Sequence, residues 1–267
     1  MRTLLLLLLL TPALLHAQST ETDLKARLLH QPLYLRGLWH DNNLHFDLAG
    51  HLLGASAPVS FTIAGIEISK LQLTATGLTL EGRRVGLEFK DYIPKRVGLS
   101  VGGPLITHAE RMHLEIDASF TRDYTSALNA IFAFDLSDLV PMLPPWWKPY
   151  ADQHLQPQLP GGKTATPAIP TGIAQVGKSI LAPQVIKAPE PEFSQSARSQ
   201  KYAGNSLIYL VVAATGEPGR SYILKPAGLG LDEMALAAVK QYQFKPATEN
   251  GNPVAVEINV EVNFRIF

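Results

Sequence analysis

The 267-residue chain contains no cysteine and comparatively little charge. The absence of cysteine excludes disulfides, thiolate metal sites, cysteine nucleophiles and a lipid anchor on an N-terminal cysteine. Only 17% of the residues are charged, and 23 basic residues balance 23 acidic ones. This neutrality argues against nucleic acid as a partner. Because 46% of the residues are hydrophobic, packed cores are still expected.

Familiar catalytic and metal-binding patterns are scarce. We find no His-Glu-x-x-His helix or Ser-x-x-Lys pair, and the carboxylates are scattered. Gly161-Gly162-Lys163-Thr164 resembles the end of a phosphate-binding loop, but Pro157 stands where the first glycine is required. The histidines fit no metal-site spacing and are expected to face solvent. They are His40 with His45 and Asp47, and His108 with His113. The sequence therefore predicts no enzyme, metal site or cofactor.

After the N-terminus, the sequence has no apolar run long enough to span a membrane. At the N-terminus, Arg2 precedes the apolar run Leu4–Leu10, and Ala17 follows shortly. A helix over residues 4–17 would rise about 21 Å, against a hydrocarbon core of about 30 Å. We therefore predict a secretory signal peptide over residues 1–17, cleaved after Ala17. The alternative is an uncleaved inner-membrane anchor.

Residues 20–155 are predicted to form a β-rich domain whose function the sequence does not identify. Runs that alternate apolar and polar residues recur between Leu33 and Ile116, separated by glycines. This pattern predicts an all-β barrel or sandwich. Tyr124–Phe134 has apolar residues at helical spacing and predicts one capping helix. Of two interpretations of Trp146-Trp147, core closure is preferred over a docking surface.

Residues 156–182 are predicted to be a linker. Eleven of the twenty prolines lie between positions 141 and 191. Because proline fixes φ and removes a backbone donor, we expect an extended spacer that forms no strand ladders.

The pattern changes again in residues 183–267, which predict an α+β domain of two helices on a three-stranded antiparallel sheet. The first helix is expected from Pro191 to Lys201 and the second around Leu231–Val239. Leu207–Ala213, the turn at Thr215–Gly219 and the next run form a hairpin. The last run, Val254–Phe264, alternates over its whole length and predicts an unusually long strand.

Several segments of this last third occur in a specific order. They are Pro189-Glu190-Pro191-Glu192-Phe193, Ala197-Arg198, Gly230-Leu231-Asp232, Ala238-Val239-Lys240-Gln241-Tyr242-Gln243-Phe244-Lys245-Pro246-Ala247 and Asn250-Gly251-Asn252-Pro253-Val254. In this order and spacing, about the last 85 residues resemble the TonB C-terminal domain family. One difference concerns the first helix, where the family often has an aromatic–proline pair and this chain has Phe193 followed by Ser194.

The resemblance implies a periplasmic, non-catalytic adaptor or energy-transducer-type module. Its partner would be an extended peptide of an outer-membrane TonB-dependent transporter, bound by β-augmentation at the edge of the last strand. The partner-binding residues implied in this way are Phe193, Val254, Val256, Ile258, Val260, Val262 and Phe264. Force transduction is the weaker part of the analogy, because the N-terminus looks cleavable and a β domain follows it.

Two alternatives to the adaptor remain open. In one, the β domain carries a small apolar ligand, since barrels of modest strand number can enclose one. In the other, the long last strand is half-buried or pairs with its copy in a homodimer, because exposed strand edges also pair with themselves.

Overall fold

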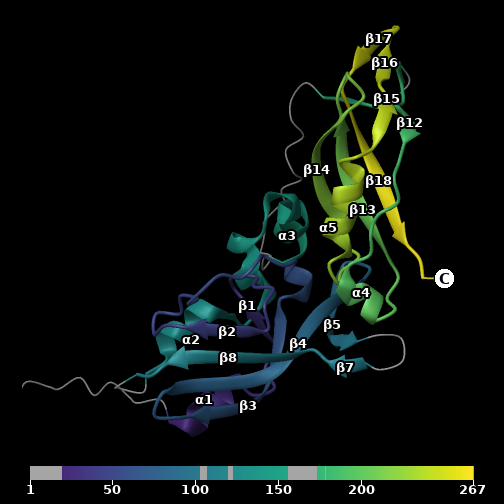
Figure 1. The fold of residues 1–267 in the computed structure, drawn as a ribbon. Coiled ribbons are helices and arrows are strands. Elements are labelled where there is room, and N and C mark those ends of the chain that lie inside the picture. Colours follow the sequence, from purple (N-terminus) through teal and green to yellow (C-terminus); the bar gives the residue numbers. More distant parts are fainter. Residues whose placement is uncertain (1–19, 103–106, 120–122, 156–172, 178, 267) are drawn as a thin grey trace, which may run out of the picture.

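The computed structural model describes residues 20–102, 107–119, 123–155, 173–177 and 179–266. The predicted signal peptide and most of the predicted linker lie outside the described residues. The described chain forms an N-terminal region, residues 20–155, and a C-terminal region, residues 173–266 (Figure 1). The two regions meet at one end of each, and β14, β13 and β18 rise away from the junction.

The N-terminal region combines strands with short helices. Its helices are α1 (Glu21–Leu28), η1 (Phe61–Ile63), α2 (Thr125–Ile131), η2 (Leu136–Met142), η3 (Pro145–Trp147) and α3 (Lys148–His154). Its strands are β1 (Leu33–Leu35), β2 (Asn43–Phe46), β3 (Gly65–Leu73), β4 (Gly77–Lys90), β5 (Ile93–Gly98), β6 (Ser100–Gly102), β7 (Thr107–Ala109), β8 (Arg111–Asp117) and β9 (Phe132–Ala133).

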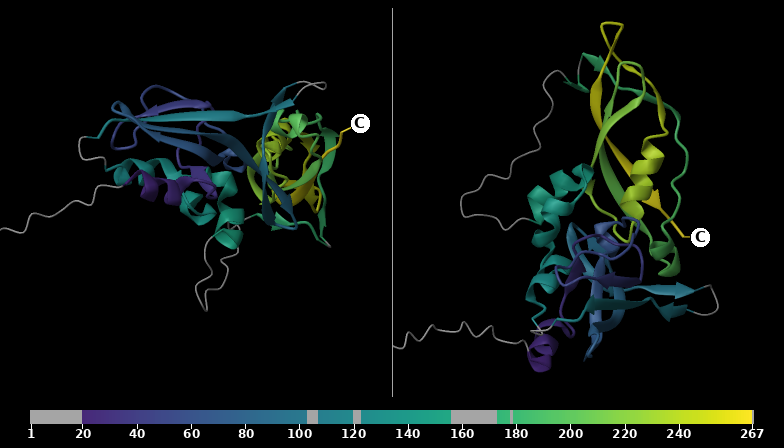
Figure 2. Two further views of the ribbon diagram at one scale, coloured as in Figure 1. Left: turned by 90° about the horizontal axis from the view of Figure 1, so that it is seen from below. Right: turned by 60° about the vertical axis from the view of Figure 1, so that its left-hand side comes forward.

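Seven of these strands form one open sheet in the order β2-β8-β4-β3-β1-β9, with β5 also paired to β4. In the described part of the chain β2 and β9 do not pair with each other, so the sheet does not close. The prediction of an all-β barrel or sandwich is therefore wrong. One face of the sheet is covered by helices and not by a second layer of strands (Figure 2). Period-two alternation in the sequence shows that one face of each strand is buried, but it does not show whether helices or strands bury it.

Apolar side chains between this sheet and the helices form the N-terminal core. Helix α1 begins at a capping box in which Asp23 N donates to Thr20 Oγ1 over 3.2 Å and Thr20 N donates to Asp23 Oδ2 over 3.0 Å. The next turns bury Leu24 and Leu28 against the sheet. The predicted helix over 124–134 is shorter in the structure, because Phe132 begins β9 and pairs with Leu35.

The C-terminal region contains two helices and nine strands within its described residues. The helices are α4 (Gln195–Ser199) and α5 (Leu231–Val239). The strands are β10 (Ala174–Gln175), β11 (Ile180–Leu181), β12 (Gln184–Lys187), β13 (Gly204–Val212), β14 (Pro218–Lys225), β15 (Gln243–Lys245), β16 (Ala247–Glu249), β17 (Asn252–Val254) and β18 (Val256–Phe264).

The main C-terminal sheet has the order β10-β18-β13-β14. The hairpin and the long last strand are antiparallel, but β10 adds a fourth strand that runs parallel to β18. Two small sheets, β11-β16-β17 and β12-β15, lie at the far end. The predicted three-stranded sheet thus gains a strand from the proline-rich segment, so the expectation that this segment forms no ladders is wrong at residues 174–175 and 180–181.

The two regions share one hydrophobic core. The loop before α5 reaches β4, where Leu229 N donates to Leu87 O over 3.0 Å. Gly228 allows this approach, because its φ is +94° and a Cβ there would lie 2.2 Å from Leu87 O. Trp147 is fully buried against Phe61, with ring centroids 4.6 Å apart. The junction is therefore packed like a domain interior, and Trp147 closes a core that both regions build.

Within the described residues, no helix combines the length and apolar character that crossing a bilayer requires.

Candidate functional site

The long final strand has one occupied edge and one largely open edge. On one side β18 pairs with β13 along its whole length, from Val256 opposite Val212 to Phe264 opposite Gly204. On the other side β10 pairs only with Val256 and Glu257. In the described part of the chain, residues 258–264 therefore have no strand beside their outer edge.

The register shows which main-chain groups point outward. Ala213 N donates to Glu217 O, and a Cβ on Gly219 would lie 3.2 Å from Val211 O, so odd-numbered residues of β13 turn toward β14. Because the backbone N–H and C=O groups of successive residues point to opposite sides of a strand, those of the even-numbered residues of β13 point toward β18. Even residues pair with even residues in this ladder. The odd-numbered residues of β18 therefore direct their N–H and C=O groups to the open edge.

The outward-directed residues are Asn259, Glu261 and Asn263, and all three side chains are exposed. Glu261 accepts a hydrogen bond from Asn205 Nδ2 over 2.9 Å on the solvent face of the sheet. The edge thus presents a row of free backbone donors and acceptors flanked by polar side chains. Such an edge can accept a further strand through main-chain hydrogen bonds.

The apolar residues of β18 face the core. Val256, Val262 and Phe264 are buried, whereas Ile258 and Val260 are partly buried and pack against the same cluster. Their side chains stabilise the domain. An added strand would therefore contact mainly the backbone of β18, together with the partly buried side chains of Ile258 and Val260.

Two predicted partner-binding residues, Val254 and Phe193, lie outside β18. Val254 lies in β17 and pairs with Ala247, because the ladder is interrupted at Ala255. Phe193 lies just before α4, partly buried, and packs edge-on against Phe264 with ring centroids 5.4 Å apart. The structure therefore brings Phe193 to the end of β18 and leaves Val254 in a different sheet.

Short helices lie against part of the opposite edge of the main sheet. The short helices η3 and α3 pack against β14, and α3 lies beside this strand in Figure 1. The cover is held by aromatic contacts, since Tyr150 packs against both Trp147 and Phe89. In the described residues neither edge of this sheet is paired with a further strand over its whole length, but η3 and α3 lie against part of β14.

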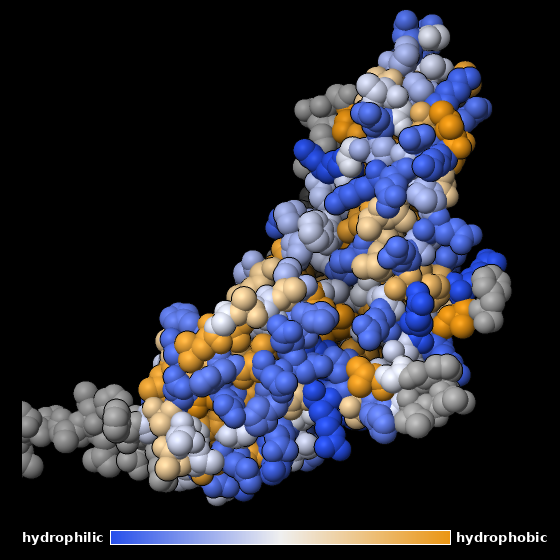
Figure 3. All heavy atoms as spheres, viewed as in Figure 1, coloured by the Kyte–Doolittle hydropathy of each residue, from blue (hydrophilic) through white to orange (hydrophobic). Residues whose placement is uncertain are grey.

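A shorter edge lies at the far end of the C-terminal region. Strand β12 pairs with β15 on one side, and its side chains Val185 and Ile186 are 59% and 69% exposed. Figure 3 shows apolar atoms at this end of the molecule, near β12. Residues 184–187 form only a four-residue strand, less than the stretch of β18 that is open.

Two carboxylates are buried where α5 meets the N-terminal region. Asp232 accepts hydrogen bonds from Ser206 Oγ over 2.7 Å and from the backbone N–H of Ala227 and Gly228 over 2.8 Å each. Its neighbour Glu233 accepts from Trp147 Nε1 over 2.9 Å. Asp232 therefore fixes the loop that docks on β4, and Glu233 links α5 to η3.

Burial strongly affects both acids. Loss of solvation raises the pKa of Asp232 to about 7, with a further contribution from Glu233 and opposition from its hydrogen-bond donors. Loss of solvation also raises the pKa of Glu233, against the hydrogen bonds from Trp147 and Ser60. Because both folded-state pKa values lie above the unfolded ones, the stability that these groups contribute is present at low pH and is lost as pH rises through the folded values.

This sign gives a testable pH dependence. We expect the free energy of unfolding to fall by on the order of 2 kcal/mol between pH 5 and pH 8. In Glu233→Gln the free energy of unfolding is expected to fall less over this range. The glutamine side chain still accepts the hydrogen bond from Trp147, but it has no carboxylate to ionise beside Asp232. Urea unfolding at both pH values measures this. Stability that rises over this range, or equal slopes in both proteins, would contradict the assignment.

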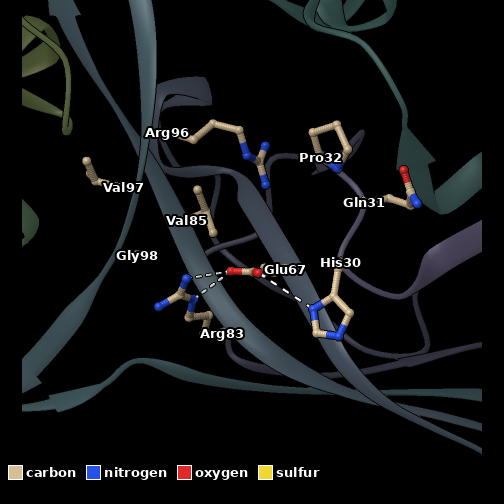
Figure 4. A pocket seen from close by; sticks show the side chains of 9 residues that line it. All are labelled: His30, Gln31, Pro32, Glu67, Arg83, Val85, Arg96, Val97 and Gly98. Carbon is tan, nitrogen blue, oxygen red and sulfur yellow. Dashed lines mark hydrogen bonds and ion pairs between the residues drawn. The ribbon is translucent and has the colours of Figure 1, made fainter.

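A small cavity of about 190 Å³ opens on the N-terminal sheet (Figure 4). Glu67 points between Arg83 and His30, with Arg83 Nη2 2.6 Å and His30 Nδ1 3.8 Å from its carboxylate. Arg96 is directed to backbone carbonyls, donating to Leu33 O and Ile66 O. The hydrogen bond from Arg83 lowers the pKa of Glu67. The charges that line this cavity already pair with one another or with the backbone, so they serve the fold.

The sequence also contains one Gly-x-Ser-x-Gly pattern, Gly98-Leu99-Ser100-Val101-Gly102. Ser100 lies in β6 and pairs with Ala109 of β7, whereas a nucleophile elbow needs a turn from a strand into a helix. The pattern therefore does not build that site.

Two of the four histidines that were considered for metal binding form hydrogen bonds with carboxylates. His45 contacts Asp117 over 2.8 Å and His113 contacts Glu115 over 2.9 Å, both near the surface. Among the described residues, no three His, Asp or Glu side chains gather as a metal site would require.

The last third of the chain is similar to known proteins. Residues 189–266 match the family model described as "Gram-negative bacterial TonB protein C-terminal". Protein TonB of Vibrio cholerae is 29% identical over 106 residues, which is 38% of this chain and 43% of that protein. The chain therefore aligns with less than half of this relative. The solution structure of the Pseudomonas aeruginosa TonB C-terminal domain shares 15% identity at a TM-score of 0.29, covering 35% of this chain and 94% of the other.

Proposed function

Since the chain ends in a TonB-like C-terminal domain, we propose that it is a non-catalytic periplasmic adaptor of the energy-transducer type. Its partner is an extended peptide of an outer-membrane TonB-dependent transporter, which pairs with the open edge of β18 over residues 258–264. Residues 1–17 act as the signal peptide, 156–182 as the linker, and 20–155 as a domain that positions the C-terminal module, residues 183–267.

The observation that carries this proposal is the open edge itself. The odd-numbered residues within 258–264 direct backbone groups away from β13, while η3 and α3 lie against part of the other outer edge of the same sheet. Strand addition gives affinity through these main-chain bonds, and flanking side chains give specificity. Ile258, Val260 and Phe193 are partly buried and lie along or at the end of this edge, so they are the side chains proposed to select the peptide.

The carrier alternative has little support in the described residues. The cavity on the N-terminal sheet is lined mainly by polar and charged groups, which do not suit an apolar ligand. The homodimer alternative competes for the same kind of surface, since a second copy can also pair at β18 or β12.

The proposal is tested by titrating the isotope-labelled protein with synthetic peptides that copy the N-terminal periplasmic segments of such transporters. Backbone amide signals of residues 256–264 are expected to shift, together with those of the facing β13. Sedimentation across a dilution series distinguishes peptide binding from self-association. Shifts confined to other regions would reject the assigned surface, and loss of the effect in dilute, monomeric protein would favour the dimer.

A further inference from the structure

A groove of about 490 Å³ opens where β18 ends. Phe264 and Arg265 line it on the side of the open edge. Phe89 and Lys90 at the end of β4, and Asp91 in the turn that follows, line it on the side of the N-terminal region. The start of β13 and the end of β14 also line it, at Gly204, Asn205 and Lys225, so the groove runs across the ends of β18, β13 and β14, and both regions contribute to it.

The charge of this groove is unbalanced. Lys90, Lys225 and Arg265 line it together with a single acid, Asp91. Lys225 Nζ lies 3.7 Å from the Asp91 carboxylate, so that acid is already paired. Lys90 and Arg265 are exposed, and neither makes an ion pair within the described chain. Two cations thus stand without an acidic partner in the groove, beside the partly buried ring of Phe89.

The existing partner of β18 indicates a direction of approach. Strand β10 runs parallel to β18 at Val256 and Glu257. A peptide that continues this parallel pairing passes Ile258 first and Phe264 last. The residues that follow its paired stretch then arrive at Arg265, and reach Lys90 by turning across the ends of β13 and β14.

From these observations, and resting on the proposed strand addition, we propose that the groove binds an acidic segment of the same partner peptide. This segment follows the stretch that pairs with β18, and its carboxylates contact Lys90 and Arg265. The N-terminal region thereby takes part in choosing the partner, because Lys90 belongs to β4. The packed junction between the two regions holds the end of β4, and with it Lys90, beside the ends of β13 and β14.

The expected contribution is modest and depends on salt. Exposed ion pairs contribute little individually, and a pair at the surface is screened at high ionic strength. Two such pairs predict a gain of about 3- to 10-fold in affinity at low salt. The gain should shrink when the salt concentration is raised to about 0.5 M.

The experiment uses the full chain and a transporter peptide whose binding shifts the β18 amides. The peptide is extended after its paired stretch by Gly-Asp-Glu-Asp or by the neutral Gly-Asn-Gln-Asn, and a third version carries the acidic residues before the stretch. Calorimetry compares their dissociation constants with the original protein, with the double variant Lys90→Gln and Arg265→Gln, and with Lys187→Gln as an exposed control lysine on β12.

The proposal requires tighter binding of the peptide that carries acids after the stretch. That advantage should disappear in the double variant and persist in Lys187→Gln, while the neutral peptide binds all three proteins equally. Equal affinity of the acidic and neutral versions, or preference for acids before the stretch, overturns the groove assignment and leaves strand addition standing. If no transporter peptide binds, the proposed function itself fails.

Discussion

Replacing Asn259 or Glu261 with proline is expected to weaken binding of the transporter peptide by about 10- to 100-fold. Both residues direct their backbone N–H to the open edge, so proline removes a donor that the visiting strand needs. A carbonyl left without its donor costs about 1–3 kcal/mol. The ladder with β13 keeps its hydrogen bonds, because an edge strand tolerates proline where its N–H faces solvent.

Two controls make this result specific. Glu261→Thr keeps the N–H and is expected to bind as the original protein does. Val260→Pro removes a donor that points to β13, so it should lower the free energy of unfolding by about 3 kcal/mol or more. Calorimetry gives affinity and urea titration gives stability. Unchanged affinity in both outward proline variants would show that the edge is not the binding surface.

Trp147→Ala is expected to produce the largest loss of stability, about 3–5 kcal/mol. The side chain is fully buried in the core that the two regions share, and its indole N–H bonds to Glu233. Alanine would leave a cavity and remove the donor from a buried carboxylate. The neighbouring Trp146 is only partly buried, so Trp146→Ala should cost clearly less.

The same substitution tests whether the two regions behave as one unit. The original protein is expected to unfold in a single transition, because the core is continuous across the junction. Trp147→Ala should separate the transition into two steps when followed by calorimetry. Equal losses in the two tryptophan variants would mean that Trp147 does not hold the junction.

The sequence predicted those C-terminal helices and strands in which apolar residues recur at a regular spacing. Alternation over the last strand and the apolar stripe of α5 both appear in the structure, since each pattern reflects one buried face. Val254 was assigned to the same strand because the alternation runs through it. The ladder nevertheless breaks at Ala255, and no periodicity marks such a break.

Other features depended on contacts that a single sequence does not encode locally. The two-residue strand β10 forms because β18 offers it an edge, and nothing in Ala174-Gln175 signals a partner about 80 residues away. The open N-terminal sheet looked like a barrel because alternation reveals a buried face without revealing what covers it. Asp232 and Glu233 resembled ordinary acids of a first helical turn, but Ser206 and the 227–228 loop bond to Asp232 and Trp147 bonds to Glu233, contacts that the local sequence does not reveal.

Amide hydrogen exchange along β18 tests the central claim most directly. In the free protein, the N–H groups of Asn259, Glu261 and Asn263 should exchange quickly, while those of Ile258, Val260 and Val262 are protected by β13. Addition of the transporter peptide should slow exchange at the three odd positions. If those positions are already protected in the free monomer, or stay unprotected when the peptide is bound, this strand is not the docking edge.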